Sequence, residues 1–360
     1  MAKPIREQVI VVAGASSGIG LATAKEAARR GAKVVLAARN AADLHRAVDE
    51  IVRNGGDAIA VPTDVTVPEQ VEALGRRAVE QYGRVDTWAH VAGVSAYATF
   101  REQSADDFRR VVEVNFFGQV NGARVALPLL EQTGGALICV GSTLSDRGVP
   151  LQGAYCASKH AIKGWLDALR VELQHEGSSV RVTLVKPSSI DTPLFDKART
   201  QLGVMPQPIP PIYEPELAAE VILRAAEGNE RDAFVGGAGK LLSVAERLSP
   251  KLVDLQQRRQ GFDSQKTDWP KAADAPTNLY APVPHDGGVR GDFSSRASTR
   301  SVYQRLAAHP VAGSLAGAAA AGLGALVLRR VRDGGAAPAL LALGALLLTS
   351  KGTLAATYTR

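Results

Sequence analysis

The hydrophobic residues of this 360-residue chain occur in two alternating patterns. Short continuous runs rich in β-branched residues, such as residues 9–12, are typical of strands buried on both faces of a parallel sheet. Between these runs lie longer stretches with helical spacing, and glycines such as Gly31 and Gly83 end several of them. The predicted strands are residues 8–13, 33–37, 58–61, 85–91, 136–140, 180–185 and 233–235.

Helices alternate with these strands along the chain. Such an order requires right-handed crossovers, so it predicts an α/β fold: a Rossmann-like, doubly wound parallel sheet of about seven strands with helices on both faces. An irregular C-terminal extension and an apolar helical hairpin are expected to follow this body. The predicted helices are residues 20–30, 41–52, 69–82, 105–132, 155–175 and 216–227.

A glycine-rich segment follows the first predicted strand directly and opens a helix. Gly14 permits a tight turn, Gly18 lets backbone N–H groups approach a pyrophosphate, and Gly20 allows close packing. The alternative is a turn that serves the fold alone. The predicted cofactor contacts of this segment are Gly14, Ser16, Ser17, Gly18, Ile19 and Gly20.

The end of the second predicted strand indicates which dinucleotide binds. An acidic residue there would bind the free 2′-hydroxyl of NAD, but the chain has Arg39, whose guanidinium suits a 2′-phosphate. We therefore predict NADP(H) rather than NAD(H). Asp64, after the third strand, is expected either to accept a hydrogen bond from the adenine amino group or to cap a helix.

Ser142, Tyr155 and Lys159 form the candidate catalytic set. A tyrosine titrates near pH ~10, and a lysine four residues later on a helix lies on the same face. The ammonium would favour the phenolate and so lower the tyrosine pKa, while a serine at a nearby strand end could orient a carbonyl or alcohol. The alternative is an ordinary surface pair, because Tyr-x-x-x-Lys is common.

Taken together, these motifs resemble those of the short-chain dehydrogenase/reductase family over about residues 10–237. The resemblance implies transfer of a hydride between NADP(H) and an alcohol or carbonyl compound, with Tyr155 as the acid/base. It implies that Lys159 lowers the tyrosine pKa and binds the nicotinamide ribose, that Ser142 orients the reacting oxygen, and that Asn115 holds a proton-relaying water. It also implies pairing of subunits into a homo-oligomer. The further cofactor contacts that it implies are Val65, Ala92, Gly93, Tyr155, Lys159, Pro187 and Thr192.

The sequence departs from the family pattern at a few positions. Ala13 stands where the family usually has threonine, His90 and Val91 replace two asparagines, and Ser188 replaces a glycine. Because Ala92 still allows close backbone approach, we expect cofactor binding to survive. We interpret His90 as a packed strand residue rather than a second base.

Composition excludes some functions. Aromatic residues make up only 5% of the chain, which argues against a stacking surface for single-stranded nucleic acid. The whole net charge of +6 arises in residues 281–360, where nine basic residues outnumber three acidic ones, so the body is neutral. The two cysteines, Cys139 and Cys156, predict neither a disulfide framework nor a metal site.

We assign residues 1–260 to the dinucleotide-binding and catalytic domain, 261–305 to an irregular extension and 306–360 to an apolar, basic tail. In the tail, residues 311–328 and 334–350 are uncharged. They predict a hairpin in the cytoplasmic leaflet of a membrane, or a soluble tail packed on the body or a second subunit. Because the N-terminus lacks an apolar leader, we predict a cytoplasmic protein, with the membrane's cytoplasmic face as the site of contact.

Residues 190–213 occupy the position of the family's substrate lid. Their many apolar residues and prolines favour a hydrophobic alcohol, ketone or aldehyde as substrate, although the same residues could simply pack the loop. An alternative function is a non-catalytic NADP(H)-binding module that uses its tail for assembly.

Overall fold

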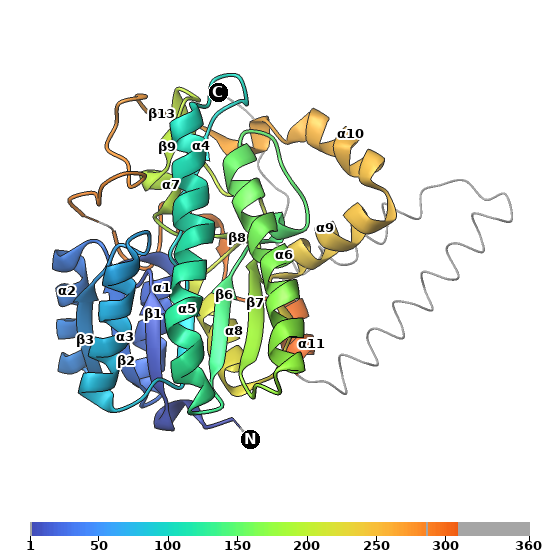
Figure 1. Ribbon diagram of the computed structural model, residues 1–360. Coiled ribbons are helices and arrows are strands. Elements are labelled where there is room, and N and C mark those ends of the chain that lie inside the picture. Colours follow the sequence, from blue (N-terminus) through green and yellow to red (C-terminus); the bar gives the residue numbers. More distant parts are fainter. Residues whose placement is uncertain (1, 286, 309–360) are drawn as a thin grey trace, which may run out of the picture. The chain divides into compact units, whose positions relative to one another are not determined.

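The computed structural model describes residues 2–285 and 287–308 (Figure 1). A seven-stranded parallel sheet with the order β12-β7-β6-β4-β1-β2-β3 forms the centre, which confirms the predicted fold. The sheet strands are β1 (Val9–Ala13), β2 (Lys33–Ala38), β3 (Asp57–Pro62), β4 (Thr87–His90), β6 (Ala136–Val140), β7 (Arg181–Pro187) and β12 (Asp232–Val235).

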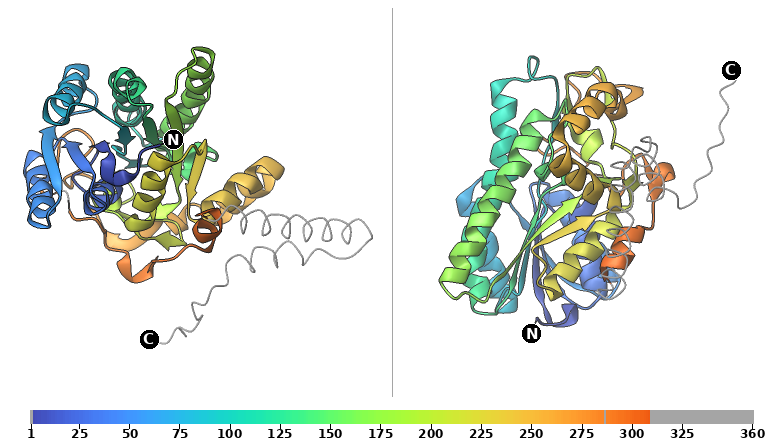
Figure 2. Two further views of the ribbon diagram at one scale, coloured as in Figure 1. Left: turned by 90° about the horizontal axis from the view of Figure 1, so that it is seen from below. Right: turned by 90° about the vertical axis from the view of Figure 1, so that its right-hand side faces the viewer.

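Three helices cover each face of the sheet (Figures 1 and 2). Alternate residues of a strand point to opposite faces, so Ile10 and Val12 join one apolar cluster and Val11 joins the other. One face carries α1 (Gly18–Arg29), α2 (Ala41–Arg53) and α8 (Pro215–Glu227), and the other carries α3 (Pro68–Tyr82), α5 (Gly118–Glu131) and α6 (Gly153–His175).

The stretch predicted as a helical region over residues 105–132, with interruptions at Gly118 and Gly122, contains a change of winding. It consists of α4 (Ala105–Val112), a π-helical turn (Glu113–Phe117) and α5. Within α5, a Cβ on Gly122 would lie 2.5 Å from the Nδ1 atom of His90. Glycine at this position therefore lets the helix approach β4 closely.

Residues beyond β12 return to the body. Strand β13 (Lys266–Pro270) pairs with β10 (Val204–Pro206), and β14 (Ala297–Ser298) pairs with β11 (Ile212–Tyr213). The extension expected to be irregular thus contains two short strands. The other helices up to Ser301 are α7 (Leu194–Lys197), α9 (Gly237–Leu248) and α10 (Pro250–Gln260). The other strands are β5 (Ala96–Tyr97), β8 (Ser189–Ile190) and β9 (Arg199–Thr200). Short 3₁₀ turns lie at Ile5–Glu7, Thr143–Ser145, Asp263–Gln265 and Ser294–Arg296.

The chain divides into two compact units, Met1–Ser301 and Val302–Arg360. Of the second unit the structure describes α11 (Val302–Ala308). The hairpin predicted for residues 311–328 and 334–350 lies outside the described residues. Within residues 2–285 and 287–308, no helix has both the length and the apolar character needed to cross a membrane.

Candidate active site

The structure brings together the three residues of the candidate catalytic set. Ser142 follows β6 and caps a 3₁₀ turn, where its Oγ accepts a hydrogen bond of 3.1 Å from the Leu144 N–H. Tyr155 lies in the first turn of α6, and Ser142 is close enough to influence the pKa of its hydroxyl. The Lys159 Nζ lies 5.4 Å from the centre of the Tyr155 ring and donates to the Val140 carbonyl at 2.9 Å.

Burial decides the protonation of these groups. It raises the pKa of Tyr155 to about 12, although the nearby Ser142 side chain acts to lower it. Burial also lowers the pKa of Lys159 to about 8. In the chain on its own, desolvation of the phenolate is the largest influence and the pKa of Tyr155 is raised, so the lowering by Lys159 that the resemblance implies stays a prediction.

Asn115 adjoins this set from the π-helical turn. It is fully buried, and its Oδ1 accepts from the Val94 N–H at 2.8 Å. Its Nδ2 donates to the Val94 carbonyl and to the Ser158 hydroxyl, each at 3.0 Å. A Cβ on Gly93 would lie 3.3 Å from the Asn115 Oδ1 and 3.8 Å from the Lys159 Nζ. Asn115 therefore holds the loop after β4 beside Lys159.

The glycine-rich turn forms a tight cradle at the carboxyl end of β1. A Cβ on Gly14 would lie 2.5 Å from the Ala92 nitrogen, and a Cβ on Gly20 would lie 1.9 Å from the Gly14 oxygen. Gly14 and Gly18 also have φ angles of +94° and +55°. Such close backbone approach at a helix N-terminus fits the pyrophosphate of a dinucleotide.

The other predicted cofactor contacts border this cradle or the adjoining strand ends. Thr192 lies against Gly18, where a Cβ would come within 3.2 Å of its side chain. Pro187 ends β7, and its carbonyl accepts from the Thr143 hydroxyl at 3.1 Å. Ser16 and Ile19 are partly buried in the glycine-rich segment, and Val65 is buried beside Gly118.

Lys197 is a neighbour of the cradle that sequence reasoning missed. It lies in α7, is buried, and donates from its Nζ to the Ser17 hydroxyl at 2.8 Å. The sequence offered no distinctive signal, because Lys197 is one of several charged residues in the lid, with Asp191, Asp196 and Arg199. This contact ties the lid to the glycine-rich turn.

Arg39 and Asp64 lie where the sequence predicted the adenosine end. Arg39 donates to the backbone carbonyls of Asn278 and Tyr280, at 3.2 Å for Tyr280. Asp64 accepts from the backbone and the hydroxyl of Thr66 at 3.0 and 2.8 Å. Burial acts to raise the pKa of Asp64, but the Thr66 hydrogen bonds and the charges of nearby arginines lower it overall. These bonds form a local turn ahead of α3, whose N-cap is Val67, so Asp64 does not cap this helix.

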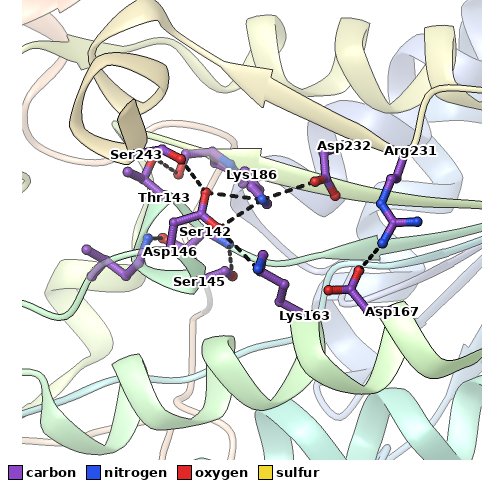
Figure 3. Close-up of polar contacts among 12 residues, drawn as sticks. Ser142, Thr143, Ser145, Asp146, Lys163, Asp167, Lys186, Arg231, Asp232 and Ser243 are labelled. Atoms are coloured by element: carbon purple, nitrogen blue, oxygen red, sulfur yellow. Dashed lines mark hydrogen bonds and ion pairs between the residues drawn. The ribbon is translucent and has the colours of Figure 1, made fainter. Parts of the chain in front are cut away.

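A buried ionic network lies behind the catalytic turn, and the sequence analysis did not predict it. Lys186, 1% exposed, donates to both Asp146 oxygens at 3.1 Å and to Asp232 at 3.4 Å (Figure 3). Ser243 donates to Asp146 at 2.8 Å. Because Asp146 follows the turn that Ser142 caps, the network fixes the position of this turn. The sequence signal was a lysine that directly follows the apolar pair Leu184 and Val185 near the end of a strand.

The lid packs on the extension. Phe195 and Ile212 are buried in one apolar cluster with Tyr97, Leu151 and Phe293. For these two lid residues the structure favours the packing interpretation. Leu194, Leu202 and Met205 also pack against this cluster but keep partial exposure. Val204 and Ile209 are two other partly exposed apolar residues of the lid.

His90 is buried in β4, where burial and the Lys159 charge lower its pKa to about 3. It is therefore neutral at physiological pH. Among the residues that the structure describes, no group of three or more His, Cys, Asp or Glu side chains could hold a metal ion.

Known proteins are similar to this chain in sequence and in fold. The family model described as short chain dehydrogenase matches residues 8–203. The "uncharacterized oxidoreductase YxnA" of Bacillus subtilis is 38% identical over 316 residues, which cover 86% of this chain and 87% of that protein.

Two solved structures are also similar. A short-chain dehydrogenase/reductase from Burkholderia phymatum in complex with NAD is 27% identical with a TM-score of 0.62, covering 69% of this chain and 95% of that one. An alcohol dehydrogenase from the archaeon Thermococcus sibiricus, complexed with 5-hydroxy-NADP, is 25% identical with a TM-score of 0.56, covering 63% and 95%.

Proposed function

Since this chain belongs to the short-chain dehydrogenase family and is an oxidoreductase, we propose that it interconverts a hydrophobic alcohol and its ketone or aldehyde with NADP(H). The observation that carries the proposal is the placement of Ser142 beside Tyr155, with the Lys159 Nζ over the phenol ring. The nicotinamide cofactor supplies or accepts the hydride when bound.

Each side chain of the site has its own role in the reaction. Tyr155, with a pKa near 12, carries its proton at neutral pH and donates it to the carbonyl oxygen during reduction. Ser142 orients that oxygen. Lys159, which is held by the Val140 carbonyl, supports the phenol ring of Tyr155. Asn115 keeps the loop after β4 beside Lys159.

Two observations support the cofactor and substrate class. Arg39 and the lack of an acidic residue at the end of β2 favour a 2′-phosphate and hence NADP(H). The partly exposed apolar lid residues, among them Leu202 and Met205, favour a hydrophobic substrate. Lys197 and the glycine cradle would hold the pyrophosphate.

The test is a panel of carbonyl compounds and alcohols with Tyr155→Phe as the key variant. We expect turnover to fall about 10³-fold, because the general acid is lost, while NADPH binding measured by fluorescence stays within about twofold. Tyr82→Phe is the matched control, since the Tyr82 hydroxyl bonds to Asp57 on α3's side of the sheet. Undiminished turnover by Tyr155→Phe would contradict the mechanism, and turnover of small polar sugars alone would contradict the substrate class.

A further inference from the structure

Part of the extension lies directly on the predicted cofactor contacts. We call residues 278–283 and 287–291 the strap; Figure 1 shows this stretch in orange above α2. The Gly18 N–H, expected to face a pyrophosphate, donates to the Gly288 carbonyl at 3.1 Å. The Arg39 guanidinium, expected to face a 2′-phosphate, donates to two strap carbonyls, those of Asn278 and Tyr280.

Further contacts anchor the strap. The side chain of Leu279 is fully buried in one apolar cluster with Ala13 and Val65. The Leu279 carbonyl accepts from the Arg110 Nε at 3.2 Å. The Asn40 Nδ2 donates to the Val283 carbonyl at 3.0 Å. Neutral carbonyl oxygens thus take several of the donors at this end of the candidate site.

The position of the strap distinguishes a cover from a competitor. A cover would touch the outer side of a bound dinucleotide and leave the protein's donors free. The strap instead touches the donors themselves, and a single N–H such as that of Gly18 makes only one strong hydrogen bond. The strap and the pyrophosphate cannot both hold it.

We propose that the strap is an intramolecular competitor for the adenosine and pyrophosphate half of the candidate site, so that the dinucleotide binds only after the strap has moved away. The proposal rests on the NADP(H) site of the proposed function. The apparent dissociation constant is then the intrinsic one divided by the fraction of chains with the strap displaced. Weakening the strap should therefore tighten cofactor binding.

The first experiment weakens the anchor with Leu279→Ser and measures NADPH binding by fluorescence titration. We expect the dissociation constant to fall at least tenfold, because a serine loses the apolar contacts that hold the strap down. Leu252→Ser is the matched control, since Leu252 is 63% exposed on α10 and should leave binding unchanged. Equal or weaker binding by Leu279→Ser, with circular dichroism showing a folded chain, would overturn the competitor.

The second experiment needs no variant. Amide hydrogen exchange of the full chain is compared with and without saturating NADPH. A displaced competitor predicts faster exchange in residues 278–283 and 287–291, whereas slower exchange there would overturn the proposal and identify a cover.

The two proposals fail in different ways. If wild type and Leu279→Ser bind NADPH equally, the strap is not a competitor but the proposed function stands. If neither chain binds NADPH or NADP and neither turns over any carbonyl, the cofactor assignment fails, and the competitor fails with it.

Discussion

The catalytic half of the candidate site is held by side chains of the body, whereas the half that we assign to the dinucleotide is covered by chain from the extension. Behind Ser142 lies the buried pair of Asp146 and Lys186, which is part of the α/β body. In front of Gly18 lies the carbonyl of Gly288, some 270 positions further along the chain.

Because of this difference, we expect one half of the site to be rigid and the other to be adjustable. In the catalytic half, separating a buried ion pair would leave its charges unpaired. Because this is costly, we expect that half to be rigid. The contacts of the strap are mainly hydrogen bonds to backbone carbonyls, which other acceptors could replace. We expect the cofactor half to be the adjustable one.

The largest effect should come from Lys186→Met. If this change also altered cofactor binding, the two halves of the site would not be independent. It leaves Asp146 buried without its main cationic partner, so the free energy of unfolding should fall by about 3–5 kcal/mol in denaturant titrations. Turnover should fall through loss of the Ser142 turn, while NADPH affinity stays within about twofold.

Lys240→Met is the control for Lys186→Met. Both lysines lie over the Phe234 ring, at 5.1 and 4.9 Å, but Lys240 is exposed. We expect Lys240→Met to change stability by less than about 0.5 kcal/mol. Equal losses in the two variants would mean that ring contact, and not the ion pair with Asp146, is what matters.

The features that the sequence predicted follow local rules, whereas those that it did not predict depend on contacts between distant residues. Tyr155, Lys159 and the glycines at 14, 18 and 20 obey local rules, namely helical spacing and the turn from a strand into a helix. Periodicity likewise predicted all seven strands of the sheet.

The remainder depends on contacts between residues far apart in the chain. No local pattern of residues 261–299 indicates that Leu279 is buried beside Ala13, or that β13 pairs with β10. The raised pKa of Tyr155 also escaped prediction, because sequence spacing reveals the charge of Lys159 but not the burial of both groups.

The second largest effect should be the pH dependence of stability in Lys159→Met. The pKa of Lys159 is about 8 in the folded chain against 10.5 for an ordinary lysine, so between these values the unfolded chain binds more protons. In wild type this lysine therefore makes the free energy of unfolding rise from pH 8 to 10.5, by as much as about 3 kcal/mol. The variant should lack that rise in urea titrations.

The exposed Lys251 gives a control, because Lys251→Met should keep the wild-type profile. A Lys159→Met profile parallel to that of wild type would show that Lys159 is not desolvated. The rigid catalytic half would then lack one of its buried charges.

A smaller effect, on the cofactor half, is expected for Arg39→Asp. An acidic residue at the end of β2 suits a free 2′-hydroxyl, so the ratio of turnover with NADP(H) to that with NAD(H) should fall at least tenfold. The change would also remove the guanidinium that binds the Asn278 and Tyr280 carbonyls, so the strap would lose two of its contacts. Arg53→Asp, at the end of α2, should leave the ratio unchanged. A wild-type preference for NAD(H) would refute the role of Arg39.

The smallest effect concerns Gly164, an exposed position within α6, the helix that carries Tyr155 and Lys159. A Cβ there would meet no atom within 4 Å, so Gly164→Ala should raise the free energy of unfolding by about 0.5–1 kcal/mol in denaturant titrations. If the catalytic half is already rigid, this stiffer helix should leave the turnover number unchanged. A change of several-fold would show that α6 moves during turnover, and the contrast between a fixed catalytic half and an adjustable cofactor half would then have to be abandoned.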